Sequence, residues 1–230
     1  MKKFCCFLLT IIFCSISLLT VAEESEKKIL FRNNEWGASF EEVRASFPSS
    51  IRWWTPDADS SYSIMDHMLG THSFHFDGHV CCYVSPISSS LKDFKVAGYD
   101  VSYIQLRFAF IPTDEGIIVE DYKHTALYFA KYRIDCRNAL SARDDLIEKL
   151  SVLYGNEYIK SSPPFSFTDT YYTWYGAEGT MLTLMIDIGY SKPRVELMYG
   201  FKGGDALLLN AYKALEYQES IISKSNYDGL

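Results

Sequence analysis

Residues 99–110 read YDVSYIQLRFAF, and this stretch decides the fold because apolar and polar side chains alternate along it. That period of two predicts a long strand with one buried face. Residues 124–134 show a similar pattern and are expected to pair with it across a loop at 111–119. The side chains expected in the core are Ile104, Leu106, Phe108 and Phe110.

Shorter strand patterns lie on both sides of this pair. Residues 74–84 read FHFDGHVCCYV, in which Asp77-Gly78 predicts a hairpin with a two-residue turn. A second hairpin is expected near the C-terminus, closed by residues 176–179. The remaining predicted strands are 51–54, 170–175, 180–188 and 194–201.

Two capping boxes predict where helices begin, because a serine hydroxyl and a carboxylate three residues later can satisfy each other's free backbone donors. Ser39 with Glu42 opens one predicted helix, and Ser141 with Asp144 opens another, which is expected to end at Gly155. The predicted helices span 40–47, 141–154 and 205–223. The expected buried stripe of the second helix is Leu146, Ile147, Leu150, Leu153 and Tyr154.

Groups of strands joined by short turns and separated by single helices predict an α+β domain with an antiparallel sheet. We expect two or three helices to pack on it, the first two on one face and the C-terminal helix last. The single domain is expected to span 31–224, before a short tail at 225–230. A helix followed by strands occurs twice, which indicates two possible halves, 31–134 and 135–224.

The first 22 residues have the pattern of a secretory signal peptide. Two lysines precede an apolar run from Phe4 to Val21, and the small residue Ala22 marks the expected cleavage site. The alternative is an uncleaved anchor. Serines and threonines dilute the run and an acidic linker at 23–30 follows it, which favours cleavage. The expected location is the periplasm or the extracellular space.

The net charge of the chain is −7, and loss of the leader's two lysines makes it more negative. An acidic chain without a basic run repels phosphate backbones, so nucleic acid is not an expected partner. Membrane contact is expected only through the leader before cleavage. Three cysteines follow the leader, Cys81, Cys82 and Cys136. Cys81 and Cys82 are neighbours on a strand, so only one of them can point inward. The odd count predicts a bridge from that inward thiol to Cys136 with one spare thiol, an intermolecular bridge, or three buried thiols.

Several short motifs recur together in this chain. Residues 36–43 read WGASFEEV, 74–80 read FHFDGHV, 150–155 read LSVLYG, and Trp174 lies in the closing hairpin. In this the chain resembles a broad set of exported bacterial envelope proteins without assigned function, which show a W-G-x-S-x-x-x-V helix start and an L-x-x-x-Y-G helix end. The resemblance implies a fold and a compartment but no catalytic residue. The usual proline after the Tyr-Gly pair is absent, and His79 replaces a typical Lys or Arg.

A histidine-rich segment at 67–79 is the candidate metal site. It contains His67, His72, His75 and His79, of which His72, His75 and His79 are the candidate zinc ligands. Strand parity makes these side chains diverge, which favours partly exposed hairpin histidines instead. No cofactor is expected.

Aromatic residues make up 16% of the chain, which raises the possibility of a binding surface for a partner or ligand. The candidates are Trp53, Trp54, Tyr172 and Trp174. Adjacent indoles on an extended segment cannot both point inward. The alternative is that each pair of adjacent rings places one in the core and one on the surface.

No sequence signature of nucleophilic or acid–base catalysis stands out, since the serines and carboxylates are explained by caps and solvated faces. The sequence therefore favours a non-catalytic exported protein-interaction or ligand-binding module, whose partner is an envelope protein, a peptide or a glycan. The alternative is a metal- or ligand-dependent enzyme that uses the histidine-rich hairpin 67–79.

Overall fold

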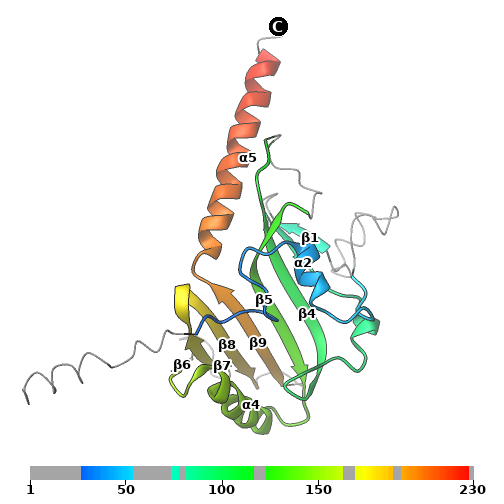
Figure 1. Cartoon of the computed structure of the whole chain (residues 1–230), viewed down its shortest axis with the longest axis vertical. Coiled ribbons are helices and arrows are strands. Elements are labelled where there is room, and N and C mark those ends of the chain that lie inside the picture. Colours follow the sequence, from blue (N-terminus) through cyan, green and yellow to red (C-terminus); the bar gives the residue numbers. More distant parts are fainter. Residues whose placement is uncertain are drawn as a thin grey trace, which may run out of the picture.

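The computed structural model describes residues 27–53, 74–77, 81–114, 116, 123–162, 169–188 and 193–227. A nine-stranded sheet forms one layer, and the helices α2 (Phe40–Ala45) and α4 (Ala139–Tyr154) pack against it (Figure 1). The named strands pair antiparallel throughout. The predicted α+β class, with helices packed on an antiparallel sheet, is confirmed.

The order of strands across the sheet is β1-β2-β4-β5-β9-β8-β7-β6, and β3 pairs with β4. The strands are β1 Phe74–Asp77, β2 Cys81–Val84, β3 Lys95–Val96, β4 Tyr99–Phe110, β5 Thr125–Asp135, β6 Ile159–Ser161, β7 Asp169–Tyr175, β8 Thr180–Asp187 and β9 Arg194–Phe201. Short 3₁₀ turns occur at η2 (Ser88–Leu91) and η3 (Ala177–Gly179). The strand predicted at 51–54 is not formed: in the described part, Trp53 makes only an isolated bridge with Pro86.

The two halves of the chain repeat one order of elements. Helix α2 precedes β1, β2, β4 and β5, and α4 precedes β6 to β9. The last strands of the two halves, β5 and β9, pair at the middle of the sheet, with Tyr132 opposite Leu197. Apart from β3, the sheet therefore consists of two four-stranded meanders that meet at β5 and β9.

Helix α2 begins at the predicted capping box. The backbone N–H of Glu42 donates to Ser39 Oγ at 3.3 Å, and the backbone N–H of Ser39 donates to Glu42 Oε2 at 2.7 Å. Phe40 and Val43 are buried against the sheet. The helix ends at Ala45, two residues earlier than predicted.

Helix α4 begins two residues before the predicted start. Asn138 caps it, because its Oδ1 accepts the backbone N–H groups of Leu140 and Ser141 at 3.0 and 3.1 Å. The predicted Ser141 capping box is therefore wrong, since an Asn upstream already satisfies these donors. The predicted end is confirmed: Gly155, with φ 91°, donates to Ser151 O. Leu153, predicted to be buried, is exposed in the last turn.

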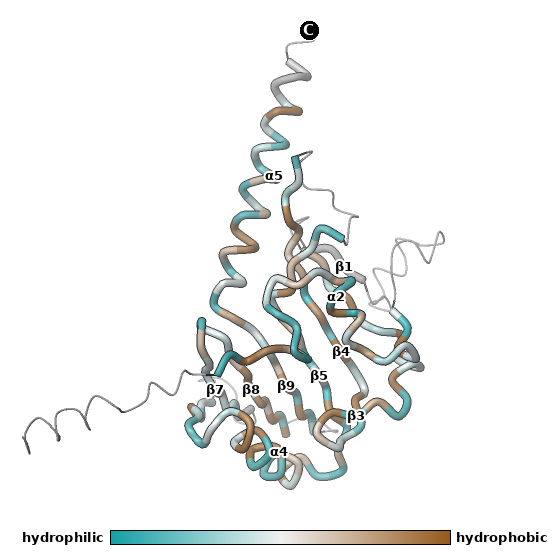
Figure 2. Tube along the Cα trace, in the orientation of Figure 1, coloured by the Kyte–Doolittle hydropathy of each residue, from teal (hydrophilic) through white to brown (hydrophobic). Residues whose placement is uncertain are grey.

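Helix α5 (Gly204–Tyr227) follows β9 directly and extends beyond the sheet (Figure 1). It contacts β4 and β5, and its Ala211 is fully buried. Apolar positions recur along its whole length (Figure 2), and several of its apolar side chains, including Leu209 and Ile222, are exposed. No helix in the described part of the chain, including α5, is both long enough and apolar enough to span a bilayer.

The core lies between the helices and the face of the sheet that we call the inner face. It contains the predicted residues Ile104, Leu106, Phe108 and Phe110, all buried. Aromatic rings join the layers: Phe40 of α2 lies edge-on to Phe108 of β4 at 5.8 Å. The outer face is the opposite one, formed by the alternate residues of the same strands.

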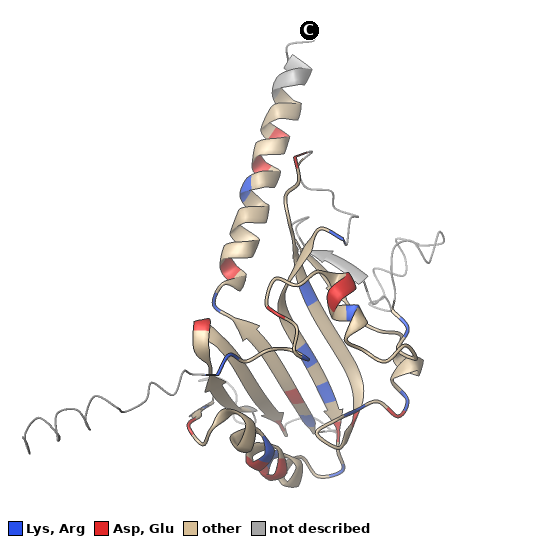
Figure 3. Ribbon diagram, in the orientation of Figure 1, with Lys and Arg blue, Asp and Glu red and all other residues tan. Residues whose placement is uncertain are grey.

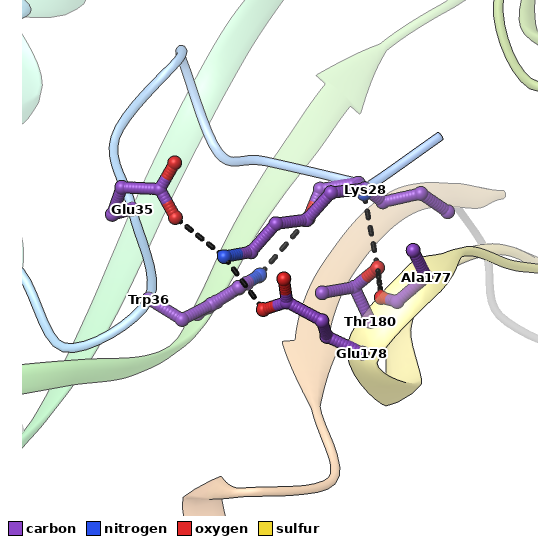
Figure 4. A network of polar contacts seen from close by, with 7 residues as sticks. Lys28, Glu35, Trp36, Ala177, Glu178 and Thr180 are labelled. Carbon is purple, nitrogen blue, oxygen red and sulfur yellow. Dashed lines mark hydrogen bonds and ion pairs between the residues drawn. The ribbon is translucent and has the colours of Figure 1, made fainter. Parts of the chain in front are cut away.

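The N-terminal segment at 27–36 crosses the inner face and is tied to the turn between β7 and β8 (Figure 4). Lys28 Nζ pairs with Glu35 at 2.6 Å and with Glu178 at 2.8 Å. Ile29 N–H donates to Thr180 Oγ1 at 2.9 Å, and the Trp36 indole donates to Ile29 O at 2.9 Å.

The close approach of this segment requires a glycine in the β7–β8 turn. A Cβ at Gly176 would lie 2.5 Å from the Lys27 carbonyl oxygen.

The hairpin of β1 and β2 has a longer connection than predicted. Asp77 lies opposite Cys81, so residues 78–80 connect the strands and the two-residue Asp77-Gly78 turn is wrong. In this register the backbone of Phe76 is paired with that of Cys82.

Cys81, Cys82 and Cys136 are not joined in disulfide bonds, which agrees with one of the predicted alternatives. Cys82 belongs to the core and Cys81 is buried on the outer face. Burial raises the pKa of the Cys82 thiol well above its ordinary range, so this cysteine is an unreactive core residue.

Candidate functional site

The outer face of the sheet carries the candidate site. Directly opposed residues share a face, so the strand register defines three rows of side chains across β4, β5, β9 and β8. One row holds Tyr103, Arg133, Glu196 and Met185; the next holds Gln105, Lys131, Met198 and Thr183; the third holds Arg107, Phe129, Gly200 and Met181. Helices α2 and α4 leave this face uncovered because both pack on the inner face.

Glu196 is the buried acid within these rows, with only 5% of its side chain exposed, and Asp187 in the next row of the same face is also buried. Its Oε2 pairs with Lys131 Nζ at 3.1 Å, and its Oε1 pairs with Arg133 Nη2 at 2.9 Å. The side chains of Lys131 and Arg133 remain 17% and 35% exposed. The two ion pairs compensate the desolvation of the carboxylate, while both cations keep contact with solvent.

Tyr103 packs beside the same two cations. Its ring centroid lies 5.3 Å from the Arg133 guanidinium and 6.0 Å from Lys131 Nζ. A cation over an aromatic face is attracted by the ring quadrupole, which fixes both side chains across the middle strands.

Arg107 is the third cation of this face and is held differently. Its guanidinium lies 4.8 Å from the ring of Tyr83 on β2 and 4.7 Å from the ring of Phe129 on β5. These strands flank β4, so the guanidinium contacts one ring from each neighbouring strand. Its Nη2 donates to Gln105 Oε1 at 3.5 Å, which is a weak bond at that length.

The Nε atom of Arg107 has no hydrogen-bond partner. Among the described residues it is the single buried side-chain nitrogen or oxygen atom in this state. A buried N–H without an acceptor costs about 1–3 kcal/mol, so proteins rarely keep one without a reason. Within the same described part, Arg107 forms no ion pair with an acid.

Arg107, Lys131 and Arg133 together form what we call the basic face, with Glu196 as its acid. Within these three rows, three positive charges oppose one negative charge, and the next row of the same face adds Arg194 opposite Asp187, in a chain whose net charge is −7. Figure 3 shows these basic positions in line on β4 and β5, next to one acidic position of β9. Partial burial lowers the effective dielectric constant, so the excess positive charge attracts an anion more strongly than an exposed surface would.

A second surface adjoins the basic face on the same side of the sheet. We call it the methionine patch, and it consists of Met181, Met185 and Met198, all half-buried. Thr183 lies among them and its hydroxyl is 3.0 Å from that of Thr173 on β7. Methionine side chains are unbranched and polarizable, so such a surface can adapt to apolar groups of different shapes.

The predicted aromatic surface is not formed. Trp53, Tyr172 and Trp174 are only 8%, 5% and 0% exposed, so these rings belong to the core, and Trp54 lies outside the described residues. Tyr172 and Trp174 lie on the same face of β7, as predicted, but this is the inner face. The outer positions of β7 are Tyr171, Thr173 and Tyr175.

The predicted zinc ligands cannot be placed from this structure. His72 and His79 lie outside the described residues, and only the backbone of His75, in β1, is described. Elsewhere, within the part of the chain that the structure describes, no group of three or more His, Cys, Asp or Glu side chains gathers as a metal site.

A groove of about 460 Å³ lies beside α2. Phe47, Pro48 and Trp53 form its apolar wall, and Glu41 and Arg44 lie on it with opposite charges. These charges cancel, so the groove favours neither an anionic nor a cationic ligand.

Sequence reasoning missed the basic face, although part of its signal is present. Gln105 and Arg107 occupy the polar parity of 99–110, and Lys131 and Arg133 occupy the corresponding parity of the partner strand. The pairing of β5 with β9, which brings Glu196 between them, joins residues far apart in the chain and has no local signature.

The comparisons with known proteins add no further constraint. No protein-family model, curated protein or solved structure matches this chain.

Proposed function

We propose that the mature chain is an exported, non-catalytic binding module and that its partner docks on the outer face of the sheet through an anionic group. The observation that carries the proposal is the buried and unpaired Nε of Arg107, within a basic face that has excess positive charge. A partner that displaces the side chains covering this atom and supplies an acceptor would remove a cost present in the free protein.

The envelope or the extracellular space is the proposed location, reached through the leader at 1–22. N-terminal sequencing of protein recovered outside the cytoplasm should then begin at Glu23. Recovery of the intact leader in the membrane fraction would contradict cleavage.

The proposed partner is an envelope protein, a peptide or a glycan rather than nucleic acid. The support is electrostatic: the basic face is local, while the chain as a whole repels polyanions. A short anionic group can approach the basic face without bringing a long negative backbone against the acidic surface.

The test is a comparison of partner capture by three proteins. One is the wild type, and the second carries Arg107→Gln, Lys131→Gln and Arg133→Gln. The third is a matched control with the same loss of charge, at exposed basic residues outside the rows of this face: Arg44→Gln on α2, Arg137→Gln and Lys213→Gln.

Each protein is immobilised and incubated with the envelope fraction, and bound species are identified after washing. The proposal expects a species that the wild type and the control retain and the basic-face variant loses, with weaker retention at high salt. Equal retention by all three proteins would overturn it, and so would the absence of any retained species.

A further inference from the structure

We propose that the group bound by Arg107 is a carboxylate of an acidic peptide, and that an apolar side chain of the same peptide packs on the methionine patch. This rests on the proposed function and adds the chemical class of the partner.

The ring contacts of Arg107 restrict how it can bind. The guanidinium carbon lies 4.8 Å from the Tyr83 ring and 4.7 Å from the Phe129 ring, and a guanidinium donates hydrogen bonds only in its own plane, so a partner must approach its edge. That edge presents N–H groups in a planar fork, which matches the two oxygens of a carboxylate. A carboxylate can displace the Gln105 side chain from Arg107 Nη2, because the hydrogen bond between them is 3.5 Å long and therefore weak.

The neighbouring cations are less available to a ligand. Glu196 already binds both Lys131 and Arg133, so they supply attraction at a distance, and Arg107 supplies the direct contact. A dianionic phosphate is best bound by several free cations, whereas one carboxylate needs a single free guanidinium. The arrangement therefore favours a carboxylate.

A carbohydrate is a weaker fit to this face. Sugar rings bind proteins by stacking on exposed aromatic faces, but here the cations lie over the rings of Tyr83, Tyr103 and Phe129. The adjoining patch is made of methionine and threonine side chains, which accommodate peptide side chains.

The sheet sets the spacing of the two anchors. Three strand intervals separate β4, which holds Arg107, from β8, which holds Met181 in the same row. At about 4.8 Å for each interval this is roughly 14 Å, the length of about four residues of an extended peptide. The predicted motif is an acidic residue followed or preceded, about four positions away, by an apolar one.

The probe is an acetylated and amidated heptapeptide, SESTSLS, which carries one Glu and one Leu at that spacing. Three comparison peptides each differ in one feature: SQSTSLS lacks the acid, SESTSSS lacks the apolar side chain, and a phosphoserine version replaces the Glu. The fourth comparison ligand is an oligouronic acid, which carries carboxylates on a glycan. Binding is followed by nuclear magnetic resonance, with the Arg107 Nε–H signal as the reporter.

The expected result is a shift of the Arg107 Nε–H signal with SESTSLS, and affinity at least about tenfold lower for SQSTSLS. SESTSSS should still move the signal, but with weaker binding. Arg107→Lys keeps the charge and should lower affinity by about tenfold, because an ammonium cannot form the planar fork. Arg137→Gln, the exposed control, should bind as the wild type does.

Three outcomes would overturn the inference: equal binding of SESTSLS and SQSTSLS, tighter binding of the phosphopeptide or the oligouronate, or full affinity in Arg107→Lys. If Arg107→Lys fails to fold, the comparison of SESTSLS with SQSTSLS on the wild type still decides the matter. Loss of captured species in the basic-face variant with no response to SESTSLS would leave the proposed function standing and the carboxylate assignment wrong.

Discussion

The indole of Trp174 donates a hydrogen bond to the backbone carbonyl of Gly155 at 3.0 Å. Trp174 lies in β7 and Gly155 ends α4, so this bond joins the helix end to the sheet. Trp36, in the first of the short motifs, stacks on Phe201 of β9 at 5.1 Å. Residues of three short motifs in the sequence therefore hold the fold together, which explains why none of them marks a site.

Trp174→Phe should destabilise the protein by about 2 kcal/mol, because the side chain is fully buried and the Gly155 carbonyl loses its donor. Urea denaturation measures the change. Tyr175→Phe is the control: it also alters an aromatic residue of β7, but at an exposed position, and should change stability by less than about 0.5 kcal/mol. Equal effects of the two substitutions would contradict a role for the hydrogen bond and the burial.

The start of α4 can be tested by two alanine substitutions. Asn138→Ala should cost about 1 kcal/mol, because two backbone N–H groups lose their acceptor. Ser141→Ala should be nearly neutral, since its N–H is capped by Asn138 and its side chain is exposed and is not the cap. Thermal unfolding of both variants measures the two losses of stability. A larger loss for Ser141→Ala would show that the helix begins at Ser141, as expected from the sequence.

The capping box of α2 makes stability depend on pH. The Ser39 backbone N–H, followed by its hydroxyl, lowers the pKa of Glu42 below its ordinary range. A carboxylate with a lowered folded pKa stabilises above its unfolded pKa of about 4.3, and this contribution is lost as pH falls through the folded pKa. Glu42→Gln should therefore show a smaller fall in stability than the wild type between neutral pH and pH ~3.

Urea midpoints at the two pH values measure this difference. Glu41→Gln removes the same charge at the adjacent exposed position and should follow the wild type. An equal fall of the urea midpoint in all three proteins would show that the Glu42 carboxylate contributes nothing to the loss of stability at acid pH.

The fold was predictable to a large extent because its strands pair locally and alternate cleanly. The strand at 99–110 alternates regularly from Tyr103 to Phe108, and the structure forms it between the predicted bounds, with a register shift between Val101 and Tyr103. The start of α4 was not predictable by the same reasoning, because Ser141 and Asp144 match the capping pattern while Asn138 has the same chemistry three residues earlier.

The candidate site was less predictable, for a physical reason. Alternation shows which residues of a strand share a face, but it does not show which face a second element covers. Tyr172 and Trp174 have the predicted common parity and lie on the inner face. The basic face depends on the pairing of β5 with β9. This pairing brings Glu196 next to Arg133, although 63 positions separate the two residues in the sequence.

Glu196→Gln tests the balance of charges on the outer face, and two opposite effects are expected. Stability should fall by about 2–3 kcal/mol, because Lys131 and Arg133 lose their partner in a half-buried setting. Affinity for SESTSLS should rise by about threefold or more at low salt, because the basic face gains one net positive charge. Glu178→Gln removes an exposed partner of Lys28 and should change stability by less than about 0.5 kcal/mol and leave binding unchanged. Weaker binding by a folded Glu196→Gln protein would mean that Glu196 orients the cations for the ligand, and an unchanged stability would mean that its ion pairs contribute nothing to the fold.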